Sequence, residues 1–340
     1  MKKKAFNFLS CLWIFVFTQL QVVKAQAINL ATENYVTPEM FGCSCAPDIN
    51  PSVNADNMQR AINVAIKEGK KLISSGGKVY PIGKELLIDG PIEMDLGKAV
   101  LVAMDSINII HIAIKPSLQW YGLITGFTID MNNIAKSGIL VESAIKMHFC
   151  DGEIRNVSKN GTAITIESGY ELFFNRIHIT AGSNYATGIK ISTSDCHFSD
   201  CVMINCNTAI NNYGSNVYNR IHAWMGDRGK WLSGSVFFLS RGGESYLNQC
   251  CSDTFYTSFK ITSSSLLFVN QQKNLHNKKM WEEKNFFPYF FYFDPKAVGN
   301  SKVYMTCSRI GGLSKNGKNI QHFTNNDNTE IEIIGCSIAP

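Results

Sequence analysis

The chain has 340 residues, with 32 Lys and Arg side chains against 27 Asp and Glu, and a formal net charge of +5. Four of the lysines lie within residues 1–27, which contain no acidic residue, so the remainder carries 28 basic and 27 acidic side chains. This balance argues against a nucleic-acid-binding protein, which needs a basic surface. A content of 45% hydrophobic and 17% charged residues excludes an intrinsically disordered chain.

Residues 1–27 have the three parts of a secretory signal peptide in the right order. Three consecutive lysines stand at 2–4, an apolar stretch covers 5–23, and small residues near 25–27 suit cleavage. Polar residues interrupt the apolar stretch and leave too short a span for a membrane anchor. We therefore expect an exported protein that is secreted, periplasmic or on the cell surface, with no transmembrane segment after removal of the signal.

Residues 28–95 are predicted to form an N-terminal cap and the first rung of a repeat. Over 55–66, apolar residues recur at helical spacing, which predicts an amphipathic helix that covers the open end of the fold. Asn54 or Asp56 is expected to cap its N-terminus. Its apolar face is made of Met58, Ala61, Ile62, Ala65 and Ile66.

Residues 96–270 contain an internal repeat with a period of about 24 residues. Short β-rich runs begin 25, 25, 21, 26 and 23 residues apart, usually after a small residue. Their first residues are Ile139, Ile164, Ile189, Ile210, Val236 and Phe259. A second series, here called the marker series, keeps step with the first and consists of Phe149, Phe174, Phe198, Tyr218 and Leu247.

Each repeat holds two or three short strands, too few to bury their own apolar faces. Stacking places each strand about 4.8 Å from its counterpart in the next repeat, in long parallel sheets. The sequence therefore predicts an all-β fold, a right-handed parallel β-helix. The alternative, a β-sandwich, would need hairpin turns, for which only the Asn-Gly pairs at 160–161 and 316–317 are good signals.

A tight corner is predicted directly after each marker residue. Asn tolerates the left-handed backbone that such a corner requires, so we expect a partial asparagine ladder there. The residues at this position are Cys150, Asn175, Ser199, Asn219 and Asn248.

The C-terminal part is less regular. Residues 271–300 are predicted to be an inserted loop or a terminal cap, and 301–340 to form irregular final rungs. A longer connection that includes Asp227, Arg228, Lys230 and Trp231 offers an aromatic side chain for stacking on a sugar, although Trp224 and Trp231 are both expected to be partly buried under a loop.

Ten cysteines remain after the signal peptide. Several lie in strand-like runs where a small buried hydrophobe fits, which favours free thiols over one or two disulfides. Cys196, Cys201 and Cys206 are five residues apart, a spacing that matches no zinc site. We expect neither a metal nor a cofactor.

Three stretches near the N-terminus carry a family resemblance: 36–42 (VTPEMFG), 56–62 (DNMQRAI) and 77–83 (GKVYPIG). They resemble the N-terminal segment of the pectate lyase-like superfamily, which includes rhamnogalacturonase-type enzymes and phage tailspikes. The Gly-Asp-Gly turn typical of that family is absent at 43–48. The resemblance implies a pectate lyase-like β-helix with a carbohydrate-related role, and it identifies no active site, because this segment only caps the fold.

Aligning the repeats on the marker series brings polar residues into two columns on the outer face. The column two positions after the marker alternates in charge: Asp151, Arg176, Asp200 and Arg220. The column four positions after it holds an acid and two histidines: Glu153, His178, Val202 and His222.

Two interpretations of these columns remain open. In the first, the charged column is a cross-strand ladder that fixes the register of the strands. In the second, it belongs to a polysaccharide groove, where Glu153 and His178 are the candidate catalytic residues and His178 moves a proton. The candidate substrate-binding residues are Asp151, Arg176, Asp200, Arg220 and His222, with the arginines pairing with uronate carboxylates.

These features predict an exported β-helix protein that acts on or binds a polysaccharide, with uronate-containing chains among the candidates. If it is an enzyme, it is a calcium-independent polysaccharide lyase or a glycoside hydrolase, since alternating arginines oppose a bound cation. Galacturonase-type hydrolases have an adjacent Asp-Asp pair, which this chain lacks. The alternative is a non-catalytic glycan-binding, surface or tailspike-like structural protein. We expect a monomer rather than an oligomer.

Overall fold

The computed structural model describes residues 33–115, 121–182, 185–226, 234–275, 289–310 and 329–338. The predicted signal peptide, most of the 271–288 segment and the connection that contains Trp231 lie outside the described residues. Within the described part of the chain, no helix is long and apolar enough to cross a membrane.

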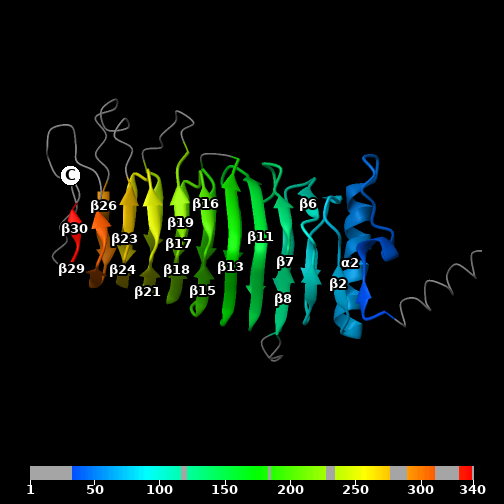
Figure 1. Cartoon of the computed structure of the whole chain (residues 1–340), viewed down its shortest axis with the longest axis horizontal. Coiled ribbons are helices and arrows are strands. Elements are labelled where there is room, and N and C mark those ends of the chain that lie inside the picture. The colour runs from blue at the N-terminus through cyan, green and yellow to red at the C-terminus, as the bar shows by residue number, and fades with distance from the viewer. Residues whose placement is uncertain are drawn as a thin grey trace, which may run out of the picture.

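The chain forms a right-handed parallel β-helix, as predicted (Figure 1). One sheet has nine strands, each paired in parallel with its counterpart in the next rung. These strands are β4 (Leu86–Ile88), β7 (Asn108–Ala113), β10 (Ser137–Ser143), β12 (Thr162–Ile166), β14 (Thr187–Ile191), β17 (Thr208–Asn212), β20 (Val236–Ser240), β23 (Thr257–Ser263) and β26 (Tyr289–Val298).

The second sheet bends at a corner and so provides two further faces. The strands β11 (Met147–Val157) and β13 (Leu172–Ala181) run through the corner without a break. The pre-corner face also contains β1 (Tyr35–Val36), β2 (Lys71–Ile73), β5 (Glu93–Asp95), β8 (Gly122–Thr125), β15 (Cys196–Ser199), β18 (Asn216–Asn219), β21 (Gly243–Asn248), β24 (Ser265–Asn270), β27 (Ser301–Thr306) and β29 (Thr329–Ile334). The post-corner face also contains β3 (Val79–Ile82), β6 (Val100–Ala103), β9 (Thr128–Asp130), β16 (Val202–Ile204), β19 (His222–Trp224), β22 (Cys251–Asp253), β25 (Lys273–Leu275), β28 (Arg309–Ile310) and β30 (Ser337–Ile338).

A short 3-10 turn, η1 (Pro38–Phe41), and the helix α2 (Pro51–Glu68) cover the N-terminal end of the solenoid (Figure 1). The helix begins earlier than predicted, because the side chain of Asn50 caps it by accepting hydrogen bonds from the backbone N–H groups of Ser52 and Val53. The predicted cap residue Asn54 is buried instead. Its side-chain amide donates to the carbonyl of Pro81 and so joins the helix to the first rung.

The predicted register of the marker series is confirmed. Phe149 pairs with Phe174, Phe174 with Phe198, Phe198 with Tyr218, and Tyr218 with Leu247. In the nine-stranded sheet the predicted position of one run is wrong, because Phe238, and not Val236, lies opposite Ile210 on one side and Phe259 on the other. The shift of two residues keeps the same side chains pointing inward, so the apolar pattern alone did not detect it.

The predicted position of the corner is wrong by one residue. The left-handed residue is the second after each marker, and not the first, with φ values between 52° and 56°. These corner residues are Asp151, Arg176, Asp200, Arg220 and Gln249. The backbone N–H groups of Asp200, Arg220 and Gln249 donate to the next rung, as from Asp200 to the carbonyl of Asn219 at 3.0 Å.

The marker side chains form a buried aromatic stack inside the solenoid. The ring centroids of Phe149 and Phe174 are 4.5 Å apart, those of Phe174 and Phe198 4.8 Å, and those of Phe198 and Tyr218 5.5 Å. The Tyr218 hydroxyl donates to the buried side chain of Asn212 at 3.0 Å, so the one polar atom of the stack is paired.

The ten described cysteines are all free thiols, and five of them are buried. Burial raises the pKa of the Cys196, Cys201, Cys206 and Cys250 thiols to about 12. These side chains therefore serve as small apolar residues of the core. Among the described residues, no group of His, Cys, Asp and Glu has the arrangement of a metal site.

Two adjacent phenylalanines test this account of the core. Phe174 points inward and is buried, whereas Phe173 points outward. We expect Phe174→Ala to lower the free energy of unfolding by about 3–5 kcal/mol, because it leaves a cavity in the stack. Phe173→Ala should cost below about 1 kcal/mol. Chemical denaturation of the two variants checks this, and equal losses would contradict it.

Candidate functional site

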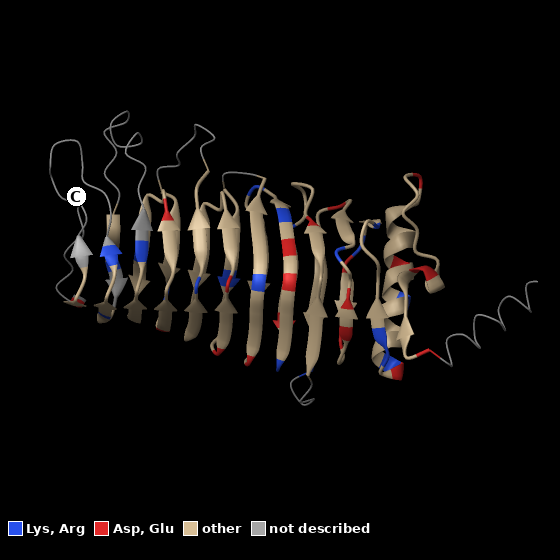
Figure 2. Ribbon diagram, viewed as in Figure 1, with Lys and Arg blue, Asp and Glu red and all other residues tan. Residues whose placement is uncertain are grey.

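The seven residues predicted to form a site all lie at the corner or on the post-corner face. Asp151, Arg176, Asp200 and Arg220 occupy the corner column, and the β-sheet pairing places Glu153 directly beside His178. His222 lies two strands further along the same column, beyond Val202. In Figure 2 the charged bands on β11 and β13 stand between strands that carry few charged residues in this view.

The corner residues neutralise one another in pairs. Arg176 donates to both carboxylate oxygens of Asp151, at 2.6 and 2.8 Å, and Arg220 does the same to Asp200, at 2.6 Å for both bonds. These bonds hold the pKa of each carboxyl below its usual range. The column continues with a hydrogen bond that the side-chain amide of Gln249 donates to the side-chain oxygen of Gln271, at 2.8 Å.

The cross-strand pairs agree with the ladder interpretation of this column. The remaining guanidinium nitrogen of Arg176 donates to Asn175 at 2.6 Å, so this side chain is committed to its neighbours on the protein. A uronate carboxylate could bind Arg176 bidentately only by displacing Asp151.

Glu153 and His178 lie opposite each other on paired strands, but no hydrogen bond joins their side chains. His178 is exposed, and no hydrogen bond or ion pair joins its ring to Glu153 or to another described residue. The geometry therefore brings the two predicted catalytic residues side by side. It does not orient the imidazole of His178, although a general base would need to be oriented.

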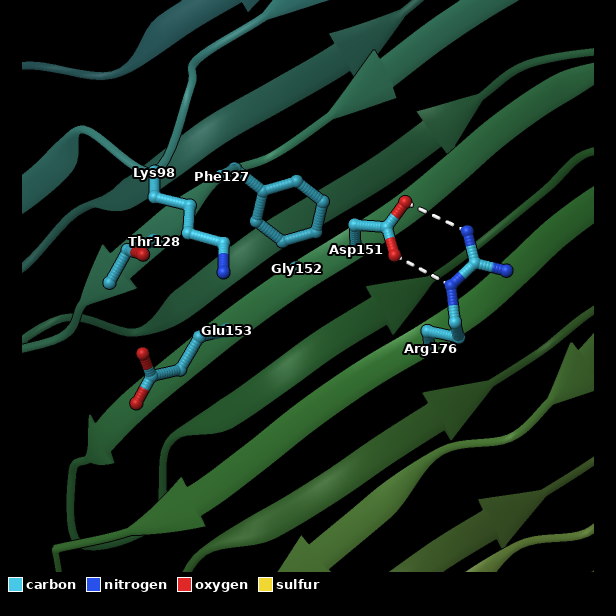
Figure 3. Close-up of a pocket in the computed structure, with 7 residues that line it drawn as sticks. All are labelled: Lys98, Phe127, Thr128, Asp151, Gly152, Glu153 and Arg176. Atoms are coloured by element: carbon cyan, nitrogen blue, oxygen red, sulfur yellow. Dashed lines mark hydrogen bonds and ion pairs between the residues drawn. The ribbon is translucent and has the colours of Figure 1, made fainter. Parts of the chain in front are cut away.

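An open pocket lies next to this pair, at the N-terminal end of the column (Figure 3). Its volume is about 350 Å³. It is lined by Lys98, Phe127, Thr128, Asp151, Gly152, Glu153 and Arg176. Figure 3 shows the ammonium group of Lys98 between Thr128 and Gly152, with the Glu153 carboxylate directed away from the Asp151–Arg176 pair.

Gly152 makes room for the buried ring of Phe127 beneath this pocket. The ring of Phe127 lies where a side chain at Gly152 would be, since a Cβ atom built there would overlap the ring. In the next two rungs the residue after the corner is Ile177 and Cys201, and each has a buried side chain at the position equivalent to Gly152. The base of the pocket is therefore formed by a large residue and a glycine in adjacent rungs, a pairing that the repeat pattern did not reveal.

Lys98 is the cation that the protein leaves available in this pocket. It lies on the connection between β5 and β6 with a left-handed φ of 66°. It forms no ion pair with any described residue, although its charge contributes to lowering the pKa of Asp151. Lys98 was not predicted from the sequence, because it precedes the first marker residue, Phe149, and so falls outside the aligned columns.

A second polar group lies further along the post-corner face. Trp224 is 41% exposed and pairs with Asp253 on the next strand, beside the pairs of His222 with Cys251 and of Cys251 with Lys273. Partial burial raises the pKa of Asp253, and the charges of His222 and Lys273 only partly offset this effect. A carboxyl group with a raised pKa next to an exposed tryptophan is a second candidate for sugar chemistry.

The fold is similar to that of a xylogalacturonan hydrolase and of phage tailspikes. The endo-xylogalacturonan hydrolase of Aspergillus tubingensis superposes with a TM-score of 0.64 at 11% identity, over 90% of this chain and 93% of that one. The tailspike gp42 of Acinetobacter phage vb_AbaP_AS12 gives a TM-score of 0.59 at 14% identity, over 91% of this chain and 63% of that one. A tailspike mutant of E. coli bacteriophage HK620 in complex with a pentasaccharide gives 0.54 at 8% identity, over 89% of this chain and 65% of that one.

These similarities confirm the pectate lyase-like β-helix, and at such low identity they concern the fold alone. The chain spans less than two thirds of the length of either tailspike. No protein-family model matches the sequence, and no curated protein matches it.

The Asp151–Arg176 pair gives a pH-dependent test. Because the pKa of Asp151 is lowered in the folded protein, its stabilising effect is present above the unfolded value and is lost as the pH falls through the folded value. Arg176→Ala should therefore lower the Tm by at most about 2 °C near neutral pH, and the difference should vanish near pH 2. Differential scanning calorimetry across this range measures it, and a difference that grows on acidification would be inconsistent with the pair.

Asp253 should behave in the opposite way. Its folded pKa is raised, so its contribution to stability is complete below the unfolded pKa and is lost as the pH rises through the folded value. We expect the isosteric variant Asp253→Asn to raise the Tm at pH 7 and to have no effect below about pH 4. The exposed Asp48→Asn serves as the control. A Tm at pH 7 that falls in Asp253→Asn would contradict the assignment.

Proposed function

We propose that this chain is an exported protein that binds an acidic polysaccharide through the outer face of its β-helix. The observation that carries the proposal is the open pocket beside the corner, which Lys98 and Glu153 line together with the paired Asp151 and Arg176. A lysine without a protein partner can hold a sugar carboxylate, while Thr128 and Glu153 offer a hydroxyl and a carboxylate to sugar hydroxyls. The likeness of the fold to a xylogalacturonan hydrolase and to a pentasaccharide-bound tailspike supports a glycan as the ligand.

The pocket supports binding better than cleavage. Glycoside hydrolysis needs two carboxyl groups with different roles, one of them protonated. In this pocket Asp151 is held ionised and occupied by Arg176, which leaves Glu153 as the only unpaired carboxylate of the lining residues. A lyase needs an oriented base, and His178 has no hydrogen-bonded partner to orient it.

Cleavage of a glycan near Asp253 is the second candidate function. The raised pKa of Asp253 suits a general acid, and Trp224 beside it can stack on a sugar ring. Asp253 lies four strands from Glu153 and two residues further along its strand, so the strand spacing alone separates them by about 19 Å and the two carboxyl groups do not form one catalytic pair.

The export of the protein is part of this proposal and is supported by the N-terminal sequence. A mature N-terminus at Gln26 or Ile28, measured by mass spectrometry of exported material, would agree with it. Recovery of exported protein that retains Met1 would contradict it.

A polysaccharide panel tests the proposed function. Polygalacturonate, xylogalacturonan and a neutral glucan should be compared by affinity electrophoresis, with unsaturated uronate absorbance and reducing ends measured in parallel. We expect an acidic polysaccharide to bind without being cleaved, and Lys98→Ala to weaken binding about tenfold.

Lys190→Ala is the matched control, because Lys190 points outward from the nine-stranded sheet, away from the pocket. Equal losses in the two lysine variants would mean that the effect is only one of net charge. Release of products by the wild-type protein but not by Asp253→Asn would favour the second candidate function.

A further inference from the structure

The pre-corner face carries an outward column of side chains that are aromatic in every rung but one from His148 to Tyr304. It lies one position before the marker series, so its residues alternate with the buried stack and face solvent. The sheet pairing aligns His148, Phe173, His197, Val217, Tyr246, Phe268 and Tyr304. Six strand spacings separate the first from the last, which makes the column about 29 Å long.

The rings of this column stack face to face along the solenoid axis. The centroids are 4.6 Å apart for His148 and Phe173 and 5.0 Å for Phe173 and His197, with interplanar angles of 19° and 18°. The second stack begins at Tyr246, whose ring lies 4.8 Å from that of Phe268 at 6°. Stacking at the strand spacing means that the ring planes stand across the axis, and that most ring faces are already covered.

The stack is interrupted at one rung, where the column holds Val217 in place of an aromatic residue. His197 and Tyr246 are therefore two strand spacings apart, about 9.6 Å. Neither ring has a stacking partner on the side that faces Val217 among the described residues. The result is a slot with two aromatic walls and an aliphatic floor, wide enough for one further ring at the spacing of the stack.

Polar groups border the slot on both sides. On one side Asp195 lies 3.3 Å from the His197 ring, and Glu244 accepts a hydrogen bond from the Tyr246 hydroxyl. On the other side the side-chain amide of Asn219 has no hydrogen-bond partner in the described part of the chain. Apolar faces for a ring, with hydrogen-bonding groups around its edge, match a sugar, which has C–H groups on its faces and hydroxyls on its rim.

We propose that this slot binds one sugar ring of the polysaccharide, sandwiched between His197 and Tyr246 over Val217. The inference rests on the proposed function and adds to it a second contact, on the face that adjoins the pocket across the corner. The sugar would complete the interrupted stack, with its hydroxyls bound by Asp195, Glu244 and Asn219.

A second copy of the chain is a poorer occupant. The whole column is one side chain wide and presents on the order of 200 Å², against about 800 Å² per partner in a standard protein interface. It is bordered by charged and amide side chains, such as the ion pair of Lys146 and Glu171, where a dimer would need a broad apolar centre.

Filling the slot with the missing ring tests the inference. Val217→Phe should stack between His197 and Tyr246, keep or raise the Tm, and weaken binding of the best polysaccharide of the panel, or of its oligosaccharides, at least tenfold. Val217→Ala leaves the slot open and should bind within about threefold of the wild type. Native binding by a folded Val217→Phe protein would overturn the inference while leaving the proposed function intact.

Removal of the walls gives an independent measurement if Val217→Phe fails to fold. Tyr246→Ala should weaken binding about tenfold, whereas Tyr292→Ala, an outward aromatic on the nine-stranded sheet, should not. Equal effects of these two variants would overturn the slot. A wild-type protein that binds no member of the panel would overturn the proposed function and the slot together. A change of oligomeric state in Val217→Phe, seen by light scattering, would assign the face to self-association and also overturn the proposal.

Discussion

A single left-handed residue in each rung is the constraint on which the rest of the structure depends. A non-glycine residue in this conformation costs about 1–2 kcal/mol, and the solenoid places one at the same corner in at least five consecutive rungs. The cost is offset where the corner N–H donates a hydrogen bond to the next rung, as from Asp200 to Asn219 at 3.0 Å and from Arg220 to Asn248 at 2.9 Å. Because this bond forms only when neighbouring corners coincide, it fixes the register of both faces of the bent sheet.

Strict register turns every outward position into a column of close neighbours. At the corner the columns place opposite charges together, and Asp151, Arg176, Asp200 and Arg220 satisfy one another in pairs. On the pre-corner face they place rings together, and most ring faces are covered. In an unbroken column, the charged groups and ring faces of the side chains are thus already in contact with neighbouring rungs. Groups become available to a ligand where the repeat is broken, as at Gly152 beneath the pocket and at Val217 in the aromatic column.

The sequence was sufficient to predict the fold and the columns, since both follow from the period of the repeat. Glu153 and His178 were correctly expected to be neighbours, and the charged column was correctly expected to alternate. The helix cap and the corner, which depend on single residues, were predicted at the wrong positions. The cap of α2 was assigned to Asn54 or Asp56 and not to Asn50, because the side chains of all three residues suit the position. The corner was assigned to the asparagines, because their intrinsic preference for the left-handed region is stronger than that of Asp or Arg.

The site residues that the sequence did not reveal lie where the columns cannot be followed. Lys98 precedes the first marker residue, Phe149, and the raised pKa of Asp253 reflects burial that no sequence motif records. In the sequence the slot at Val217 corresponds only to a missing aromatic residue. It can be recognised as a slot only when the rings on either side are known to stack.

The most direct test of the view that ligands bind at the breaks in the columns is a crystal structure with an oligosaccharide from the best-binding polysaccharide. We predict a sugar ring between His197 and Tyr246 and a sugar carboxylate at Lys98. A sugar bound along the nine-stranded sheet, with both of these positions empty, would contradict the account.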